Sequence, residues 1–133
     1  AMFAESFVQL GLIPGDGGAW FLPRVVGFSN ASLMALTGDP VKADEALRIG
    51  LVSKVVEAEE LVTTAQAIAA RIAANPPHAV RLTKQLLRGS ERNSLDEMLD
   101  KSAAFQAVCH AEPDHHEAIS AFFDKRSGAY RKD

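Results

Sequence analysis

The sequence predicts an α/β protein in which a short strand-containing segment precedes a mostly helical region. Two stretches, Met2–Leu10 and Leu51–Val56, are rich in the Phe and Val residues that strands favour. After residue 29, alanine, leucine and straight-chain charged residues dominate, and these favour helices. Two short strands do not make a stable sheet alone. Either partner strands come from a segment outside this chain, or the helices carry the fold by themselves.

The composition excludes several functional classes. The chain has 133 residues, 47% hydrophobic and 23% charged, which suits one soluble globular domain. A net charge of −3 gives no basic excess for nucleic acid. No apolar run approaches the roughly 20 residues that a membrane span needs. Cys109 is the only cysteine, so no internal disulfide forms and we expect a cytoplasmic protein.

The first expected element is a strand over Met2–Leu10, followed by a glycine-rich turn. Pro14 and Gly15 turn the chain, and Asp16 suits the N-cap of a short helix from about Gly17 to Leu22. A strand that enters a helix through such a turn aims free backbone N–H groups at whatever lies in front of the helix.

Two further helices and a strand are expected before residue 57. Pro23 is expected to bend or end the first helix, and Gly27 to supply a left-handed stop. The expected helices run from Ser29 or Asn30 to about Leu36 and from Lys42 to Ile49, closed by Gly38 and Gly50, and a strand follows over Leu51–Val56.

Four helices are expected in the remainder of the chain, because apolar residues there recur at helical spacing. Proline and glycine residues at positions 76, 77, 89 and 113 separate them. Their expected ranges are 58–74, 77–87, 94–110 and 114–124.

Candidate chemistry gathers at the glycine-rich turn. Glycines let a backbone approach a ligand closely, and a helix N-terminus favours an oxyanion. Glu5 and Asp16 are the nearest carboxylates and suit acid and base roles. Glu5 and Phe7 share one face of the expected strand, so a pocket that Phe7 faces would include Glu5. The alternative is a structural turn, with Asp16 a helix cap and Glu5 a solvent-facing residue.

The glycine-rich turn does not match a nucleotide-binding motif, and the histidines do not match a metal-binding motif. Trp20 stands where a dinucleotide fingerprint needs its third glycine. His110, His115 and His116 lack the spacing of three or four that places ligands on one helix face, so no metal site is expected. Cys109 is expected to be buried and inert. The tail from residue 122 combines aromatic and basic side chains. It suits binding of a phosphate or a purine ring, and the alternative is a solvated basic end of the chain.

Ordered motifs along nearly the whole chain resemble the crotonase superfamily, also called the enoyl-CoA hydratase/isomerase family. Each motif is weak alone, but together they occur in the order and at the spacing of the family. They are Phe3-Ala, Leu10-Gly-Leu-Ile-Pro-Gly-Asp-Gly-Gly18, Leu22-Pro-Arg-Val-Val-Gly27, Leu36-Thr-Gly-Asp39, Ala43-Asp-Glu-Ala46, Gly50-Leu-Val-Ser-Lys-Val-Val56, Glu60-Leu61, Ala79 to Lys84, and Ala121-Phe-Phe-Asp-Lys-Arg126.

The resemblance implies a spiral of stacked ββα turns followed by helices that mediate trimerisation. The match corresponds to roughly the C-terminal half of a family member. Residues 1–56 would form the end of the crotonase-like spiral core, and residues 57–133 a helical oligomerisation and C-terminal lid region. Family members bind acyl-CoA and stabilise a thioester enolate with two backbone N–H groups. Both groups belong to the N-terminal half, which this chain is not expected to contain.

The resemblance also assigns roles to residues of the turn. The second glutamate of the hydratases aligns with Phe7, which cannot exchange a proton, and this argues against two-glutamate water addition. The family's turn glycine aligns with Gly15, whose N–H would place a water or an acyl group. Some relatives carry an aspartate at that position, whereas here the aspartate follows at Asp16. Asp16 or Glu5 would then substitute for the lost carboxylate.

The resemblance therefore implies an acyl-CoA enzyme that transfers a proton at the α-carbon of a CoA thioester, as hydratase or isomerase. Phe122 and Lys125 match positions that touch the CoA nucleotide, often across a subunit boundary. No cofactor is expected, because coenzyme A is part of the substrate. The expected partners are the thioester and further copies in a homotrimer or hexamer, without nucleic acid or membrane. The alternative is an inactive C-terminal fragment that acts only as an oligomerisation module.

Overall fold

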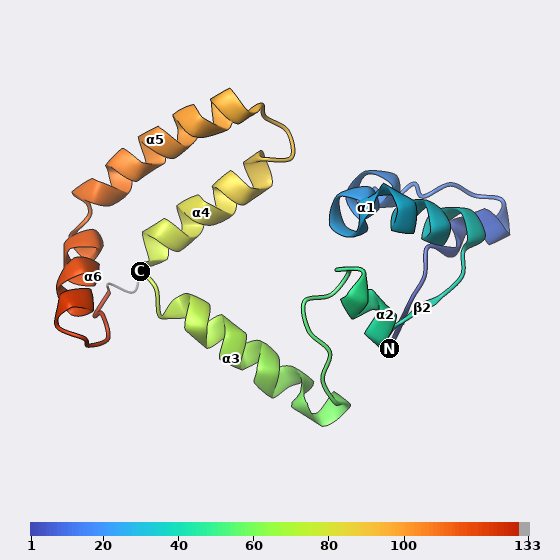
Figure 1. Cartoon of the computed structure of the whole chain (residues 1–133), viewed down its shortest axis with the longest axis horizontal. Helices are drawn as coiled ribbons and strands as arrows, with labels where there is room; N and C mark the ends of the chain where they lie inside the picture. Colours follow the sequence, from blue (N-terminus) through green and yellow to red (C-terminus); the bar gives the residue numbers. More distant parts are fainter. Residues whose placement is uncertain (131–133) are drawn as a thin grey trace. The chain divides into compact units, whose positions relative to one another are not determined.

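The computed structural model of the chain describes residues 1–130 and divides the chain into two compact units (Figure 1). The first unit is Ala1–Glu59, and the second begins at Glu60. The first contains β1 (Met2–Phe3), the 3₁₀ helix η1 (Ser6–Leu10), α1 (Gly18–Thr37), β2 (Val41–Lys42) and α2 (Ala43–Arg48). The 3₁₀ helix η2 (Ala58–Glu60) leads into α3 (Leu61–Ala73), α4 (Pro77–Gly89), α5 (Leu95–Ala111) and α6 (Pro113–Phe123).

The predicted strand over Met2–Leu10 is wrong beyond its first two residues. β1 pairs antiparallel with β2, with Met2 opposite Lys42 and Phe3 opposite Val41, and this ladder then ends. A strand needs a partner for its backbone groups, and Ser6–Leu10 instead satisfies them locally as η1. The Gln9 side chain donates a hydrogen bond to the Thr37 carbonyl at 3.0 Å, which ties η1 to the end of α1.

α1 is one helix with an internal break, where the sequence predicts two helices. Pro23 lies inside α1, so of the two predicted effects, a bend or an end of the helix, the end at this residue is wrong. The Arg24 guanidinium lies 3.4 Å from the centre of the Trp20 ring and donates to the Trp20 carbonyl at 2.9 Å, which supports the turn around the proline. The break falls at Gly27, as predicted, but its φ of 79° and ψ of 158° are not the left-handed helical values that the prediction named. The predicted stop at Gly38 is also confirmed.

α2 closes the first unit, and the predicted strand over Leu51–Val56 does not form. The predicted helix over 42–49 is confirmed to within a residue at each end. The N–H groups of Leu51 and Val52 both donate to the Ala46 carbonyl, at 2.8 and 3.3 Å, so the chain wraps around the end of α2. The Ala46 side chain is 0% exposed. Two of the N–H groups that a strand would offer to a neighbour are thus used within the turn.

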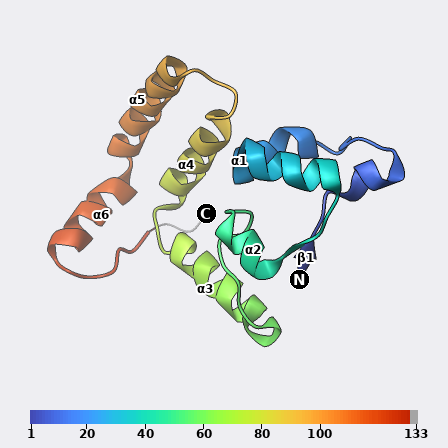
Figure 2. The same cartoon turned by 45° about the vertical axis from the view of Figure 1, so that its right-hand side comes forward.

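The four helices predicted after residue 57 are confirmed, with small shifts at their ends. Ser94 begins α5 with a capping box, in which its side chain accepts from Glu97 N–H and the Glu97 carboxylate accepts from Ser94 N–H at 2.7 Å. Proline occupies the first turn of α4 and α6. α4 lies beside α5, and α6 continues from α5 after the single residue Glu112 (Figure 2).

Few apolar side chains of the described chain are buried. α3, α4 and α5 contain no buried residue, and Ala121 of α6 is the one buried hydrophobic residue described in the second unit. Val26, Ala31, Met34 and Ala46 make up the buried hydrophobic set of the first. Leu61, Val62, Leu95 and Leu99 remain exposed. No helix within residues 1–130 is long and apolar enough to cross a membrane.

Candidate active site

The turn between η1 and α1 places an aspartate and a glycine pair at the start of α1. Gly17 is the N-cap of α1, with a left-handed φ of 98°. Asp16, one residue earlier, accepts a hydrogen bond from Gly18 N–H through Oδ1, at 3.0 Å. The predicted cap position is therefore wrong by one residue, although the Asp16 carboxylate does satisfy an N–H group of the first turn.

Glu5 approaches the same point from the other side of the turn. It immediately precedes η1, and its Oε1 atom is buried without a hydrogen-bond partner among the described residues. A Cβ atom placed on Gly18 would collide with Glu5 Oε1 and would lie 3.2 Å from Asp16 Oδ1. The two carboxylates therefore converge on one point of the α1 backbone.

The pKa of the Glu5 carboxyl is raised above its ordinary value. Burial is the larger cause, because it disfavours the charged form, and the negative charge of Asp16 adds to it. A raised pKa brings a carboxyl closer to the range in which it can both take and return a proton at neutral pH. Asp16 is engaged by Gly18 N–H, whereas Glu5 Oε1 is not engaged. Of the two, Glu5 is therefore the carboxyl with the raised pKa and with an oxygen that no described group engages.

Gly15 lies at the exposed apex of the turn. A Cβ atom there would meet the Ile13 carbonyl oxygen at 3.9 Å, which is ordinary van der Waals contact. Its φ is not in the left-handed region occupied by Gly11 and Gly17. The local fold therefore does not require glycine at this position. A side chain here would instead obstruct a group that approaches the backbone from outside.

Phe7 is a half-buried residue of η1. The predicted shared face of Glu5 and Phe7 depended on strand alternation, which does not apply in a 3₁₀ helix. Glu5 instead shares its surroundings with Asp16, which follows it by eleven positions in the sequence. Among the described residues, Glu5 and Asp16 are the two that bring a carboxyl group to this turn.

Phe122 and Lys125 lie at the end of α6, in the second unit. The Phe122 ring is 78% exposed and contacts the Phe123 ring edge-on, with centroids 5.7 Å apart. Lys125 follows α6 with a φ of 52°, the one positive value among the described non-glycine residues. The predicted basic tail continues through residues 131–133, which lie outside the described part of the chain.

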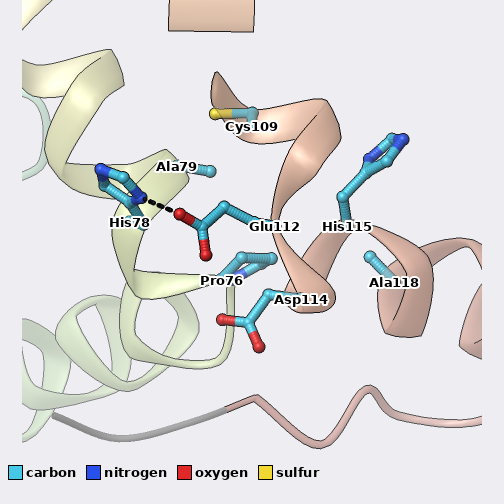
Figure 3. Close-up of a pocket in the computed structure, with 8 residues that line it drawn as sticks. All are labelled: Pro76, His78, Ala79, Cys109, Glu112, Asp114, His115 and Ala118. Carbon is cyan, nitrogen blue, oxygen red and sulfur yellow. Dashed lines mark hydrogen bonds and ion pairs between the residues drawn. The ribbon is translucent and has the colours of Figure 1, made fainter. Parts of the chain in front are cut away.

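A small pocket of about 80 Å³ lies where α4 meets the corner between α5 and α6 (Figure 3). His78 Nδ1 and Glu112 Oε1 are 3.0 Å apart across it, while the His115 ring points away from this pair. Cys109 lines the pocket and is half-buried, so the prediction of a buried cysteine is wrong.

Within residues 1–130, no three His, Cys, Asp or Glu side chains are arranged to hold a metal ion.

Sequence reasoning missed two relationships that the fold creates. The first is the contact of Glu5 with Gly18, which depends on the chain reversing between η1 and α1. The second is a bidentate ion pair between Glu117 and Arg126, at 2.5 and 3.1 Å. Arg126 belongs to one of the family-like motifs, but it follows Glu117 by nine positions, which is not the spacing of neighbours on one helix.

The chain matches one protein family and is similar in sequence to many known proteins. The family described as enoyl-CoA hydratase/isomerase matches residues 1–133. The chain is 40% identical over 127 residues to 1,2-epoxyphenylacetyl-CoA isomerase of Escherichia coli strain K12, covering 96% of this chain and 48% of that protein. It is 42% identical over 126 residues to a short-chain-enoyl-CoA hydratase of Clostridium acetobutylicum, covering 95% and 48% respectively.

Solved structures resemble this chain over nearly its whole length, and the match covers about half of each solved chain. An enoyl-CoA hydratase from Bacillus anthracis has a TM-score of 0.92 and 34% identity, covering 96% of this chain and 50% of that one. Pseudomonas aeruginosa DspI has a TM-score of 0.93 and 34% identity, covering 98% and 50%. The chain spans about half the length of the curated relatives that it matches.

Proposed function

The chain belongs to the enoyl-CoA hydratase/isomerase family, and we propose on this basis that it serves an enzyme that transfers a proton at the α-carbon of an acyl-CoA thioester. The predicted family and the crotonase-like fold class are confirmed. Its relatives include a 1,2-epoxyphenylacetyl-CoA isomerase and a short-chain-enoyl-CoA hydratase, and these names support a CoA thioester as the substrate. The single cysteine supports a reducing compartment such as the cytoplasm.

The observation that carries the proposal is the convergence of Glu5 and Asp16 on Gly18. Two carboxyl groups in one site hold their protons differently, which suits them to separate acid and base roles. Glu5 has the raised pKa and no hydrogen-bond partner, and Asp16 is fixed to the α1 backbone. We assign proton transfer to Glu5 and orientation of the helix N-terminus to Asp16. Gly15 is an exposed residue, and we assign to its N–H the positioning of the reacting group.

In an isomerase, these residues need only move one proton. Ionised Glu5 takes a proton from C2 of a 3-enoyl thioester, and the released electron pair delocalises towards the thioester oxygen. Protonated Glu5 returns the same proton to C4, so the double bond moves from C3 to C2. One carboxyl group completes this cycle, and no water is consumed.

A hydratase would also need a group to activate water. Phe7, in the position where the resemblance places a second glutamate, cannot supply it. Asp16 would have to take that role while it also accepts the Gly18 N–H. We therefore favour the isomerase chemistry.

Turnover of a 3-enoyl-CoA and of crotonyl-CoA tests the assignment. We expect Glu5→Gln to reduce isomerisation at least 100-fold, since one general acid–base typically contributes 10²–10⁴. Glu57→Gln removes an exposed carboxylate from the same unit and should change little. Asp16→Asn should act less strongly than Glu5→Gln. Unchanged isomerisation in Glu5→Gln would contradict the assignment, and hydration that exceeds isomerisation would favour the hydratase.

The open helices support a second candidate, an oligomerisation module without activity of its own. α3, α4 and α5 bury none of their residues, so their apolar faces are open to further copies in a homotrimer or hexamer. Sedimentation of the wild type and of Val62→Lys, on the exposed side of α3, tests this candidate. Assembly without any thioester turnover would support the module, and a monomeric wild type would contradict it.

A further inference from the structure

The short helix η1 contacts both ends of α1. At one end, the Oε1 atom of Glu5, the residue before η1, fills the space in front of Gly18, the first residue of α1. At the other end, Gln9 Nε2 donates to the carbonyl of Thr37, the last residue of α1, at 3.0 Å. A Cβ atom on Gly38 would lie 2.8 Å from Gln9 Cγ. The segment is therefore held between the two ends of one longer helix.

The break at Gly27 makes these two contacts possible. A straight helix of 20 residues is about 30 Å long, whereas η1, with five residues, is about 10 Å long. Gly27 has φ 79° and ψ 158°, a combination that essentially only glycine adopts, and a Cβ there would meet no atom within 4 Å. The conformation, rather than crowding, thus requires glycine. The two parts of α1 turn back at this residue, and both ends come within reach of η1.

The side chain of Asn30 completes the break. In an unbroken helix, the Val26 carbonyl would accept from the backbone N–H of Asn30, and here the Asn30 side-chain amide donates to it at 2.8 Å. Val26 on one side of the break and Ala31 and Met34 on the other are buried. The bend is therefore a packed and hydrogen-bonded part of the fold, and it sets how far apart the two ends of α1 lie.

Gln9 is the polar anchor of η1 on α1. The N–H groups of Gly11 and Leu12 donate to carbonyls within η1, at 3.1 and 3.0 Å, so these backbone bonds stay local. Among the η1 side chains, Gln9 is the one for which the described part of the chain shows a hydrogen bond outside η1. A buried carboxyl oxygen without a partner, such as Glu5 Oε1, would gain free energy by moving into water. An external contact is needed to oppose that movement.

We propose that Gln9 is a positioning residue for proton transfer: its hydrogen bond to Thr37 anchors η1 between the ends of α1 and so keeps the Glu5 carboxyl against Gly18. This inference rests on the proposed function for the role of Glu5. Gln9 lies at the opposite end of η1 from Glu5 and acts through the backbone between them.

Gln9→Met tests the anchor, because it removes the donor and keeps an uncharged side chain of similar length. We expect kcat for isomerisation of a 3-enoyl-CoA to fall about threefold to tenfold, the scale of one hydrogen bond, with KM nearly unchanged. The pKa of the Glu5 carboxyl, followed by NMR titration, should move down towards its ordinary value, because the carboxyl spends more time in water. Gln66→Met, which changes an exposed glutamine of α3, is the matched control.

Two further variants separate positioning from folding. Gln9→Lys retains a donor, one atom further along the side chain, and should retain most of the turnover. In the Glu5→Gln background, Gln9→Met should lower turnover no further, because nothing remains to be positioned. Thermal unfolding shows that each variant is folded.

Three outcomes would overturn the inference: equal losses of turnover in Gln9→Met and Gln9→Lys, an unchanged Glu5 pKa in Gln9→Met, or effects of Gln9→Met and Glu5→Gln that add. A Glu5 pKa that falls in Gln9→Met without any loss of turnover would overturn the proposed role of Glu5 instead. If the wild type turns over no thioester, the proposed function fails, and the NMR titration still tests whether Gln9 holds Glu5 in place.

Discussion

Glu5 occupies the space that a side chain on Gly18 would need, and this contact joins the start of η1 to the start of α1. The helix therefore begins against a carboxyl group that comes from elsewhere in the chain. Because Glu5 Oε1 is buried and has no hydrogen-bond partner there among the described residues, the arrangement costs stability.

Two glycine substitutions three positions apart should have opposite consequences. Gly18→Ala places a Cβ against Glu5 Oε1, so we expect about 1–3 kcal/mol lower stability unless Glu5 leaves its place. Gly15→Ala meets no close atom and should leave stability nearly unchanged while it lowers thioester turnover. Chemical denaturation and turnover of the two variants check this. Equal losses of stability would contradict the distinction.

Glu5 should make the first unit less stable as the pH rises. Its pKa is raised in the folded state, so the folded chain holds this proton more tightly than the unfolded chain does. The contribution is fully present below the ordinary glutamate pKa of 4.5, and it is lost as the pH rises through the higher folded value. Denaturation of the wild type and of Glu5→Gln between pH 4 and 8 tests the sign. The difference between them should grow with pH.

Glu117 should have the opposite dependence. Its folded pKa is about 2 against 4.5 unfolded, so its contribution is present above pH 4.5 and is lost as the pH falls towards 2. We expect Glu117→Gln to flatten this part of the stability profile. The segment after α6 can be followed by amide hydrogen exchange at Ala129, whose N–H loses its acceptor in the variant. Exchange at Ala129 that is equal in both proteins would contradict the hydrogen bond from Ala129 N–H to Glu117.

The capping box of α5 offers a local test of helix stability. Ser94→Ala removes the acceptor for Glu97 N–H, and we expect a loss of about 1 kcal/mol. Thr64→Ala, a polar-to-alanine change inside α3 rather than at a cap, provides the comparison and should not be destabilising to that extent. Thermal unfolding of both variants measures the difference.

The helices could be predicted from the sequence, and the strands could not. Helical periodicity and the prolines at positions 77 and 113 are local signals, and the structure follows them closely. Leu51–Val56 has the composition of a strand, but its first N–H groups turn to Ala46, and no local pattern indicates that choice. Strand formation depends on a partner, which composition does not supply.

The candidate site likewise combines features that the sequence predicts with features that it does not. The turn, Glu5 and Asp16 were recognised from residue types, while their convergence at Gly18 depends on a chain reversal that spacing does not reveal. Strand alternation would have paired Glu5 with Phe7, and η1 removes that pairing. The pairing of Glu117 with Arg126 is not predictable from the sequence, because the chain between them passes through a left-handed residue at Lys125 and lysine gives no signal for that conformation.

The helices that bury no residue also set how this chain should respond to heat. The heat capacity of unfolding arises mainly from apolar surface that water reaches only after the chain opens. In α3, α4 and α5, water reaches much of that surface already in the folded state. Scanning calorimetry of the chain at low concentration should therefore give a heat capacity increment below the usual ~12–15 cal/mol/K per residue, and a broad transition. The increment should rise towards that range when the faces of these helices are covered.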